Sequence, residues 1–442
     1  MIAPPDVAFL DVAPPDIGPP DIAPLDPADP VFARDPYPYY ARLRDQGPAV
    51  RVPLANGTYA WLVTGYEPTR AVLADPRFSN APPQGAGQPK GDSPAQRARA
   101  CLGRHMLNAD APDHTRLRRL TTAAFAPRRV DALRQRIEEL TAGLLREMVL
   151  RLRREGSVDL VDAFAFPLPV LVIGEVLGVP EADRADLREW TYRVGSPADA
   201  LEPGAVDEAW SGLYGYFTEL IARKRRAPGP DLFSALTQDA TDGGLDDGEL
   251  LAMAFLLLFA GYETTMNLLA SASLLLLTHP EELAAARRDP GRWPAVVEET
   301  LRHASPLEGT TWRHTTQDVD LGEGVVIPPG ASVLAVLAAA NRDPRHFTEP
   351  DSFRPARYLA GHEGSRTAPH AAFGHGAHFC LGSRLARLEA RIALPQLFAA
   401  FPRLHLTADP AQLPYRPGLL VRGPLSVPVT TAPLPAGTTV TA

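Results

Sequence analysis

Cysteine is scarce in this chain, with only Cys101 and Cys380 among 442 residues. Two cysteines cannot form the disulfide framework of a small secreted domain, so the composition favours a reducing compartment. The N-terminus also lacks a secretory signal, because acidic residues interrupt it every few positions where a signal peptide would be basic and then apolar. We therefore expect a cytoplasmic protein.

Long apolar runs and an excess of positive charge are missing as well. The longest apolar stretch, 250–261, is shorter than the ~20 residues that a membrane-spanning helix needs, so no membrane partner is expected. The net charge of −8 argues against a nucleic-acid partner, because a nucleic-acid-binding protein needs a basic face to neutralise phosphates. The composition is that of a soluble globular protein.

Proline is abundant, with 47 residues, and nine of them fall within the first thirty positions in a degenerate (A/G)PPD(I/V) repeat. Such a tract favours extended polyproline II conformation and cannot pack by itself. We predict that residues 1–33 are an extension, either a partner-docking arm or a leader on the surface, and that residues 34–442 form one domain. No later segment has the composition of a linker between two domains.

The pattern of apolar residues after the extension predicts a mainly α fold with a minor β part. A short helix is expected over 36–46, and a β-hairpin over 50–54 and 58–65, with Asn56 and Gly57 in its turn. A flexible loop is expected over 79–96, β-rich segments near 311–337 and a loop over 341–379. Helices are expected over 111–125, 127–154, 163–177, 180–194, 204–226, 245–278, 281–289, 292–303 and 381–400. The pattern over 245–278 is apolar almost all round, which is typical of a helix through the middle of a protein.

The most informative stretch is FGHGAHFCLG, residues 373–382. A lone cysteine is usually an inert buried residue. Here Gly374, Gly376 and Gly382 let the backbone approach a flat object closely, and the helix that follows points its positive end at Cys380, which favours a thiolate. A thiolate in such a loop, with no second cysteine nearby, suits the axial ligand of a haem iron.

A zinc site is the alternative for this stretch. His370, His375, His378 and Cys380 are four possible ligands within eleven residues. Their H-x4-H-x2-H-x-C spacing matches none of the usual zinc patterns, and a zinc site would give the glycines no role.

FGHGAHFCLG resembles the haem-binding loop of cytochrome P450 enzymes, and the resemblance extends from about residue 35 to residue 429. Several motifs are most similar to those of soluble bacterial members that tailor natural products. The resemblance implies a triangular, single-domain, mainly α fold with a long central helix, and haem b as cofactor. It implies Cys380 as the metal ligand, Phe373 beside the sulfur, and Gly374 and Gly382 in the haem-binding loop.

AGYETT, residues 260–265, lies midway along the long apolar helix. Ala260 and Gly261 leave room for a bulky group against the helix, and an acid in an apolar helix is costly without a function or a partner. The structural interpretation is a kink with a back-bonded threonine and with Glu263 reaching a surface cation. The resemblance instead implies that Ala260 lies beside the haem and that Glu263 and Thr264 are the acid–alcohol pair that delivers protons during oxygen activation.

The resemblance assigns three further groups of residues. Partners of the haem propionates are expected at His114, Arg118, Arg313 and His378. A buried structural network behind the cysteine loop is expected from Glu299, Arg302 and Arg357, the first two of which are three positions apart in a predicted helix. Candidates for the substrate pocket are Leu307, Thr310, Leu419 and Leu420.

These motifs together imply a haem-thiolate monooxygenase that inserts one atom of dioxygen, by hydroxylation or epoxidation, into an apolar organic substrate. A polyketide or another secondary-metabolite intermediate is the favoured substrate class, and electrons are expected from a separate ferredoxin and ferredoxin reductase. A haem-thiolate peroxygenase or isomerase is an alternative, although the retained Glu263–Thr264 pair argues against it. A haem-containing binding or recruitment protein is the alternative from outside the enzymes.

Overall fold

The computed structural model describes residues 24–82, 93–101, 105–195, 202–238, 244–359 and 369–432. The described chain folds into two compact units, the first made of Ser79–Ala132 and Pro169–Tyr262. The second is made of the described residues up to Phe78, of Leu133–Leu168, and of the described residues from Glu263 onward. The chain passes between the two units several times, within regular elements as well as between them. The prediction that residues 34–442 form one domain stays a prediction.

The first unit is helical. Helix α10 (Ala205–Arg226) lies against α4 (Pro94–Cys101), α9 (Arg184–Gly195) and α11 (Leu232–Gln238), and α11 lies against α5 (Asp113–Ala124). The contact of α10 with α9 is so close that a Cβ on Gly212 would stand 2.6 Å from the Trp190 ring. The unit also contains η2 (Met106–Asn108), α6 (Pro127–Ala132), most of α8 (Pro167–Leu177), η4 (Glu181–Asp183) and the first half of α12 (Asp247–Thr278).

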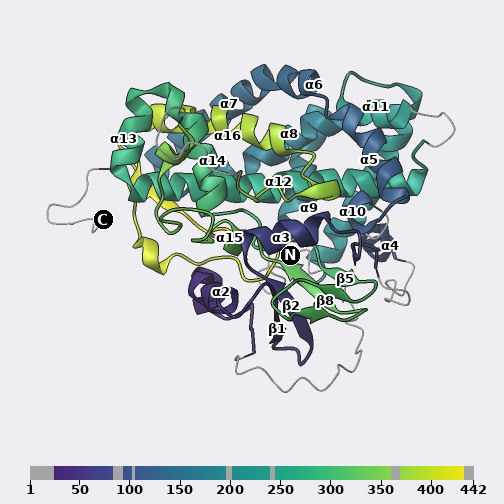
Figure 1. Ribbon diagram of the computed structural model, residues 1–442. Coiled ribbons are helices and arrows are strands. Elements are labelled where there is room, and N and C mark those ends of the chain that lie inside the picture. The colour runs from purple at the N-terminus through teal and green to yellow at the C-terminus, as the bar shows by residue number, and fades with distance from the viewer. Residues whose placement is uncertain are drawn as a thin grey trace. The chain divides into compact units, whose positions relative to one another are not determined.

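A five-stranded sheet dominates the β part. Its spatial order is β1 (Val50–Pro53), β2 (Tyr59–Val63), β8 (Ser332–Ala335), β5 (Arg313–Thr315) and β3 (Phe78–Ser79) (Figure 1). The predicted hairpin is confirmed, because β1 and β2 pair antiparallel with Val50 opposite Leu62. Its turn needs Gly57, whose φ is +84°. Strand β8 then pairs parallel to β2, which brings a segment from far along the chain into the same sheet.

Helix α3 (Tyr66–Ala74) packs on this sheet, and its Tyr66, Val72 and Leu73 join Val63, Val333 and Ala335 in one buried cluster. Two smaller sheets complete the β part. One has the order β4 (Ser157–Asp159), β10 (Pro428–Thr430) and β9 (His405–Leu406), and the other pairs β6 (Val319–Asp320) with β7 (Val326–Ile327).

The helices of the second unit surround α16 (Ser383–Ala400), which packs against α7 (Arg134–Glu155), α13 (Pro280–Arg288) and α14 (Trp293–His303). The predicted helix 127–154 is divided into two helices, α6 and α7, at Leu133. The backbone of Leu133 keeps helical angles, and no proline or glycine marks the break in the sequence. The other elements are α1 (Pro30–Arg34), α2 (Tyr37–Arg44), η3 (Val161–Ala165), η6 (Pro290–Arg292), α15 (Leu337–Ala340), η7 (Pro355–Tyr358), η8 (Gly376–His378) and η9 (Pro410–Gln412).

Helix α12 is the long apolar helix that the sequence predicted, with 32 residues. Within the described part of the chain it is the one helix with the length and apolar composition to cross a membrane, although its uninterrupted apolar run, 250–261, is shorter than a membrane span. The most apolar window of α12 is 72% buried inside the protein, which is typical of a core helix.

The end of the predicted extension is packed against the sheet. Leu25 is only 2% exposed, its N–H donates to Pro53 O (2.8 Å), and its carbonyl accepts from Ala55 N–H (3.0 Å). Phe32 is buried edge-on against Tyr40, with the ring centroids 5.7 Å apart. Residues 24–33 of the predicted extension are therefore packed on the domain, where apolar side chains interrupt the proline repeat; residues 1–23 lie outside the described chain.

We predict that two N-terminal truncations will differ sharply in stability. Removal of residues 1–23 should leave the melting temperature nearly unchanged, because this repeat can bury little apolar surface. Removal of residues 1–33 also deletes Leu25 and Phe32, and losing one such buried side chain typically costs about 2–5 kcal/mol. Thermal unfolding of both proteins followed by circular dichroism tests this. Equal melting temperatures would show that residues 24–33 contribute nothing to stability.

Candidate active site

The loop before α16 carries Cys380. The Cys380 N–H donates to Phe373 O (2.9 Å), and the Gly374 N–H donates to Ala371 O (2.8 Å), so the backbone turns back on itself on both sides of η8. Cys380 is half-buried, and α16 has no acidic residue in its first turn. The positive end of α16 is therefore not neutralised locally, which favours the thiolate form of Cys380.

Gly376 fixes this loop against α3. Its φ is +71°, and a Cβ at this position would stand 2.5 Å from the Leu73 carbonyl oxygen, so no other residue fits without moving the backbone. Gly374 has the same φ of +71° but has open space around it. A Cβ on Gly382 would lie 4.0 Å from the Cys380 sulfur, an ordinary contact, so this glycine is not sterically required here.

An ion-pair cluster around Glu298 binds the loop to its supporting helices, and the sequence analysis missed it. Glu298 of α14 accepts from Nε and Nη2 of Arg387 (both 2.8 Å), lies 3.2 Å from Arg391, and contacts His370 Nε2 (3.1 Å). Burial opposes ionisation of Glu298, but the hydrogen bonds with His370 and Arg387 outweigh it and lower its pKa to about 2. Arg387 also stacks on Phe373, 4.3 Å from the ring centroid, so the cluster reaches the residue expected beside the sulfur.

The donor set of the loop fits haem better than zinc. His370 is committed to Glu298, and among the described residues no three His, Cys, Asp or Glu side chains converge as metal ligands would. A single thiolate donor is enough to hold haem iron, because the porphyrin supplies the other ligands.

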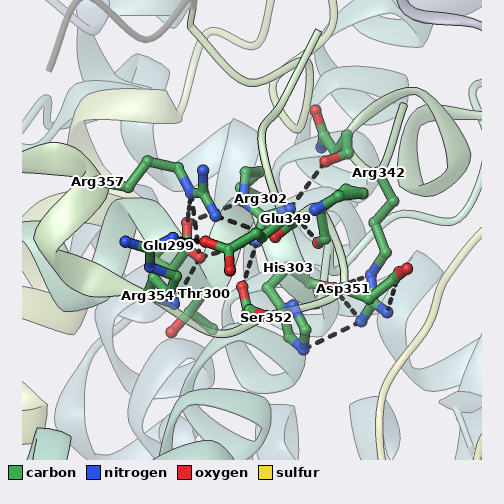
Figure 2. A network of polar contacts seen from close by, with 12 residues as sticks. Glu299, Thr300, Arg302, His303, Arg342, Glu349, Asp351, Ser352, Arg354 and Arg357 are labelled. Atoms are coloured by element: carbon green, nitrogen blue, oxygen red, sulfur yellow. Dashed lines mark hydrogen bonds and ion pairs between the residues drawn. The ribbon is translucent and has the colours of Figure 1, made fainter. Parts of the chain in front are cut away.

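The predicted Glu299 network is present behind the loop (Figure 2). Arg302 donates to both oxygens of Glu299 at 2.8 Å, and both side chains are 0% exposed. Arg357 approaches the same carboxylate to 3.3 Å. Arg302 also donates to the carbonyl oxygens of Asn341 (3.1 Å), Pro350 (2.7 Å) and Ser352 (2.9 Å), so the buried charge ties α14 to the irregular segment 341–357.

Helix α12 separates the two members of the predicted acid–alcohol pair. Glu263 is buried and forms an ion pair with Arg416 (Oε1 to Nη1, 3.3 Å), a partner that sequence reasoning did not find. Thr264 is half-buried, and Ala260, one turn earlier, is exposed in a helix otherwise covered almost all round. The face with Ala260 and Thr264 is therefore open to a bulky neighbour, which fits a cofactor beside it.

Gly261 does not contribute to that space. A Cβ on Gly261 would stand 2.7 Å from Cγ1 of Ile173, so the glycine lets α8 pack against α12. The prediction that both Ala260 and Gly261 leave room for a bulky group is thus wrong for Gly261. The next residue, Tyr262, is buried, and its hydroxyl oxygen would stand 2.6 Å from a Cβ on Gly195 at the end of α9.

The expected propionate partners lie on three elements. His114 and Arg118 are four residues apart on α5, and burial, reinforced by the charge of Arg118, lowers the pKa of His114. Arg313 lies on β5, where its Nη1 donates to Phe78 O (3.4 Å), and His378 ends η8. Two of the four are in each unit, and their role toward haem stays a prediction.

The structure brings the four substrate-pocket candidates into one patch. Glu308 N–H donates to Leu420 O (2.9 Å), and Leu307 pairs with Val421 in an isolated bridge. A Cβ on Gly309 would stand 2.7 Å from Leu419 O, so this glycine permits the pairing. Leu307, Thr310, Leu419 and Leu420 are all half-buried. Their contact with a substrate stays a prediction.

Comparisons with known proteins decide the family. The cytochrome P450 family model matches residues 293–427. Cytochrome P450 107B1 of Saccharopolyspora erythraea is 46% identical over 91% of this chain and 96% of that relative. The chain belongs to the cytochrome P450 family. The monooxygenase PikC of Streptomyces venezuelae is 45% identical over 90% of this chain and 91% of its own.

The solved structures agree on the fold. Ligand-free TamI, a P450 monooxygenase, superposes with a TM-score of 0.81 at 40% identity, over 93% of this chain and 94% of TamI. This confirms the mainly α P450 fold with its long helix, α12, and the chain is a cytochrome P450 monooxygenase. The family implies haem held by a cysteine thiolate, and Cys380 lies within the matched segment.

We predict that Glu299→Ala will be strongly destabilising. The substitution leaves Arg302 charged and fully buried, and breaking a buried ion pair typically costs about 3–5 kcal/mol. The matched control is Glu138→Ala, which removes an exposed partner of Arg134 at 3.7 Å, a kind of pair that contributes about 0–1 kcal/mol. Urea unfolding followed by circular dichroism measures both. A loss below about 1 kcal/mol for Glu299→Ala would contradict the structural role of the network.

Proposed function

We propose that this P450 monooxygenase hydroxylates or epoxidises an apolar secondary-metabolite intermediate of polyketide type, with Cys380 as the thiolate ligand of haem b. The observation that carries the proposal is the setting of Cys380, a half-buried thiol on a glycine-shaped loop at the uncompensated positive end of α16. Relatives support the substrate class: one is 6-deoxyerythronolide B hydroxylase of Saccharopolyspora erythraea, and a solved neighbour is the P450 PksS of the bacillaene polyketide synthase.

Three groups of residues would bind the cofactor: the thiolate ligand, the residues that support its loop, and the partners of the propionates. Haem held by a thiolate supplies the oxygen-activating chemistry when bound. Cys380 would bind it, and Phe373 would shield the sulfur from water. Gly376 and the Glu298 cluster hold the loop in place. His114, Arg118, Arg313 and His378 would supply the hydrogen-bond donors that two propionates need.

Glu263 and Thr264 would handle protons. The hydroxyl of Thr264 lies on the open face of α12 and would hold a water molecule beside the reaction site, while the buried carboxylate of Glu263 would exchange protons with solvent. Leu307, Thr310, Leu419 and Leu420 would present a mostly apolar wall to the substrate. By the same family resemblance, electrons come from a separate ferredoxin and its reductase, and the protein works in the cytoplasm.

Cys380→Ser tests the ligand. A hydroxyl is not ionised at neutral pH, so the variant should lose the strongly red-shifted Soret band that the reduced carbon monoxide complex of a thiolate-ligated haem shows. The absorption spectrum of the purified variant, after haem reconstitution, is the measurement. A serine variant with the spectrum and the activity of the wild type would exclude Cys380 as the ligand.

Thr264→Ala tests proton delivery. The change removes one hydroxyl and leaves the thiolate in place, so haem content and the substrate-induced spin shift should stay close to wild type. The proton-dependent step should slow by about 10²-fold, the lower end for one proton-transfer group because water substitutes in part. Reduced cofactor would then be consumed with more hydrogen peroxide and less oxidised product. The measurement is product and peroxide per NADPH oxidised, with the apolar compound that gives the largest spin shift.

Ser273→Ala is the matched control for Thr264→Ala. Ser273 is a buried α12 residue whose hydroxyl, among the described residues, bonds back to Leu269 O (2.8 Å), so its loss should leave the ratio of product to NADPH oxidised unchanged. If Thr264→Ala behaves like this control, Thr264 is a structural residue and the proton-relay assignment is wrong.

A further inference from the structure

The buried acid of α12 is held by a residue from the C-terminal part of the chain. Arg416 Nη1 lies 3.3 Å from Glu263 Oε1, and the two side chains are 14% and 8% exposed. A carboxylate buried in an apolar helix is costly without a charged or hydrogen-bonded partner, and here the partner is a guanidinium. Both residues belong to the second unit.

Arg416 stands on a rigid support. Residues 414–425, called here the C-terminal hairpin, pair with themselves: Leu425 N–H donates to Pro414 O (2.8 Å), and Arg416 N–H donates to Gly423 O (3.0 Å). Between these bonds Tyr415 lies opposite Pro424 in an antiparallel bridge. The backbone of Arg416 is therefore fixed on both sides.

The hairpin touches α12 at a second point, one turn beyond Glu263. A Cβ on Gly423 would stand 2.9 Å from the Cβ of Asn267, so only glycine lets the hairpin approach this closely. Asn267 follows Glu263 by four residues and shares its face of the helix. The Gly423–Asn267 contact thus sets the distance between the C-terminal hairpin and α12, and with it the distance between Arg416 and Glu263.

The contact with Arg416 differs from the structural clamp on Glu299. Arg302 grips both oxygens of Glu299 at 2.8 Å with both side chains fully buried. The closest approach of Arg416 to Glu263 is longer, at 3.3 Å, and neither side chain is completely covered. Glu299 is thus held through both of its oxygens by a fully buried partner, whereas the ion pair of Glu263 with Arg416 is longer and less buried.

We propose that Arg416 is a positioning residue for proton delivery: it orients the Glu263 carboxylate, and Gly423 sets the distance at which it does so. The inference rests on the proposed role of Glu263 in handling protons. If Arg416 only neutralised a buried charge, its loss would lower stability without changing the proton-dependent step.

A double-mutant cycle tests the contact without turnover. Glu263→Gln, Arg416→Gln and the double variant, each loaded with haem, are unfolded in urea. Residues in direct contact are energetically coupled, so we expect the double variant to unfold at least fivefold less readily than the product of the single effects implies. If the effect of the double variant on the unfolding equilibrium constant lies within twofold of the product of the two single effects, the two side chains are not coupled and the inference is overturned.

The solvent isotope effect on NADPH oxidation tests the positioning role. Glu263→Gln and Arg416→Gln should raise it to a similar value, with more peroxide released and an unchanged haem content. Arg416→Lys should restore part of the wild-type value, because the ammonium keeps the charge but lacks the planar fork. Gly423→Ala should act like Arg416→Gln, because its new Cβ pushes the hairpin away from Asn267.

Arg422→Gln is the matched control. Arg422 lies on the same hairpin and forms an ion pair with Glu308 (3.5 Å) that is even less exposed than the Arg416–Glu263 pair, so its loss should lower stability and leave the isotope effect unchanged. If Glu263→Gln changes neither the isotope effect nor the peroxide released per NADPH oxidised, the proposed role of Glu263 in handling protons fails. If Glu263→Gln has the effect but Arg416→Gln does not, only the present inference is overturned. Should the Arg416→Gln variant not bind haem, unchanged isotope effects in Arg416→Lys and Gly423→Ala overturn it instead.

Discussion

The fully buried Glu299–Arg302 pair is the interaction on which the support of the cysteine loop depends. Two opposite charges with no exposure are tolerable only when every polar group is satisfied, and Arg302 achieves this by donating to three backbone carbonyl oxygens as well as to Glu299. One of these carbonyls belongs to Asn341, whose side-chain oxygen accepts from Ala371 N–H (2.6 Å) at the start of the loop that carries Cys380. The buried charge of Arg302 therefore fixes the position of Asn341, and Asn341 in turn fixes the backbone at Ala371, before the loop that carries Cys380.

Helix α14 acts on that loop from two sides, because Glu298 and Glu299 are neighbours and point about 100° apart on a helix. Glu299 holds the irregular segment 341–357, and Glu298 holds His370 and the Arg387 side chain of α16. The Glu299–Arg302 pair is fully buried. The Glu298 cluster is partly open, yet the hydrogen bonds from His370 and Arg387 hold the pKa of Glu298 at about 2, so Glu298 stays ionised at physiological pH. The loop is consequently anchored before and after Cys380 by the same turn of one helix.

The features that the sequence predicted are those whose physical cause is local. The glycines around Cys380, the hairpin turn at Gly57, and the i, i+3 spacing of Glu299 and Arg302 each need only a few neighbouring residues to be interpretable. The missed features depend on tertiary approach: Arg416 meets Glu263 across the fold, Ile173 fills the space at Gly261, and Leu25 completes a sheet edge inside a proline-rich tract. The break at Leu133 was missed because its backbone stays helical.

The glycines of α12 and of the C-terminal hairpin let two neighbouring segments pack closely on one helix. Gly261 admits α8, Gly423 lets the hairpin approach Asn267, and the intervening residues are left to present Glu263 to Arg416 and Thr264 to the open face. Adjacent residues on a helix point in different directions, so an acid and an alcohol at consecutive positions lie in different environments. The acid is then held by the charge of Arg416, while the half-buried Thr264 lies one turn after the exposed Ala260. The close approaches at Gly261 and at Asn267 thus fix the stretch of α12 that carries Glu263 and Thr264.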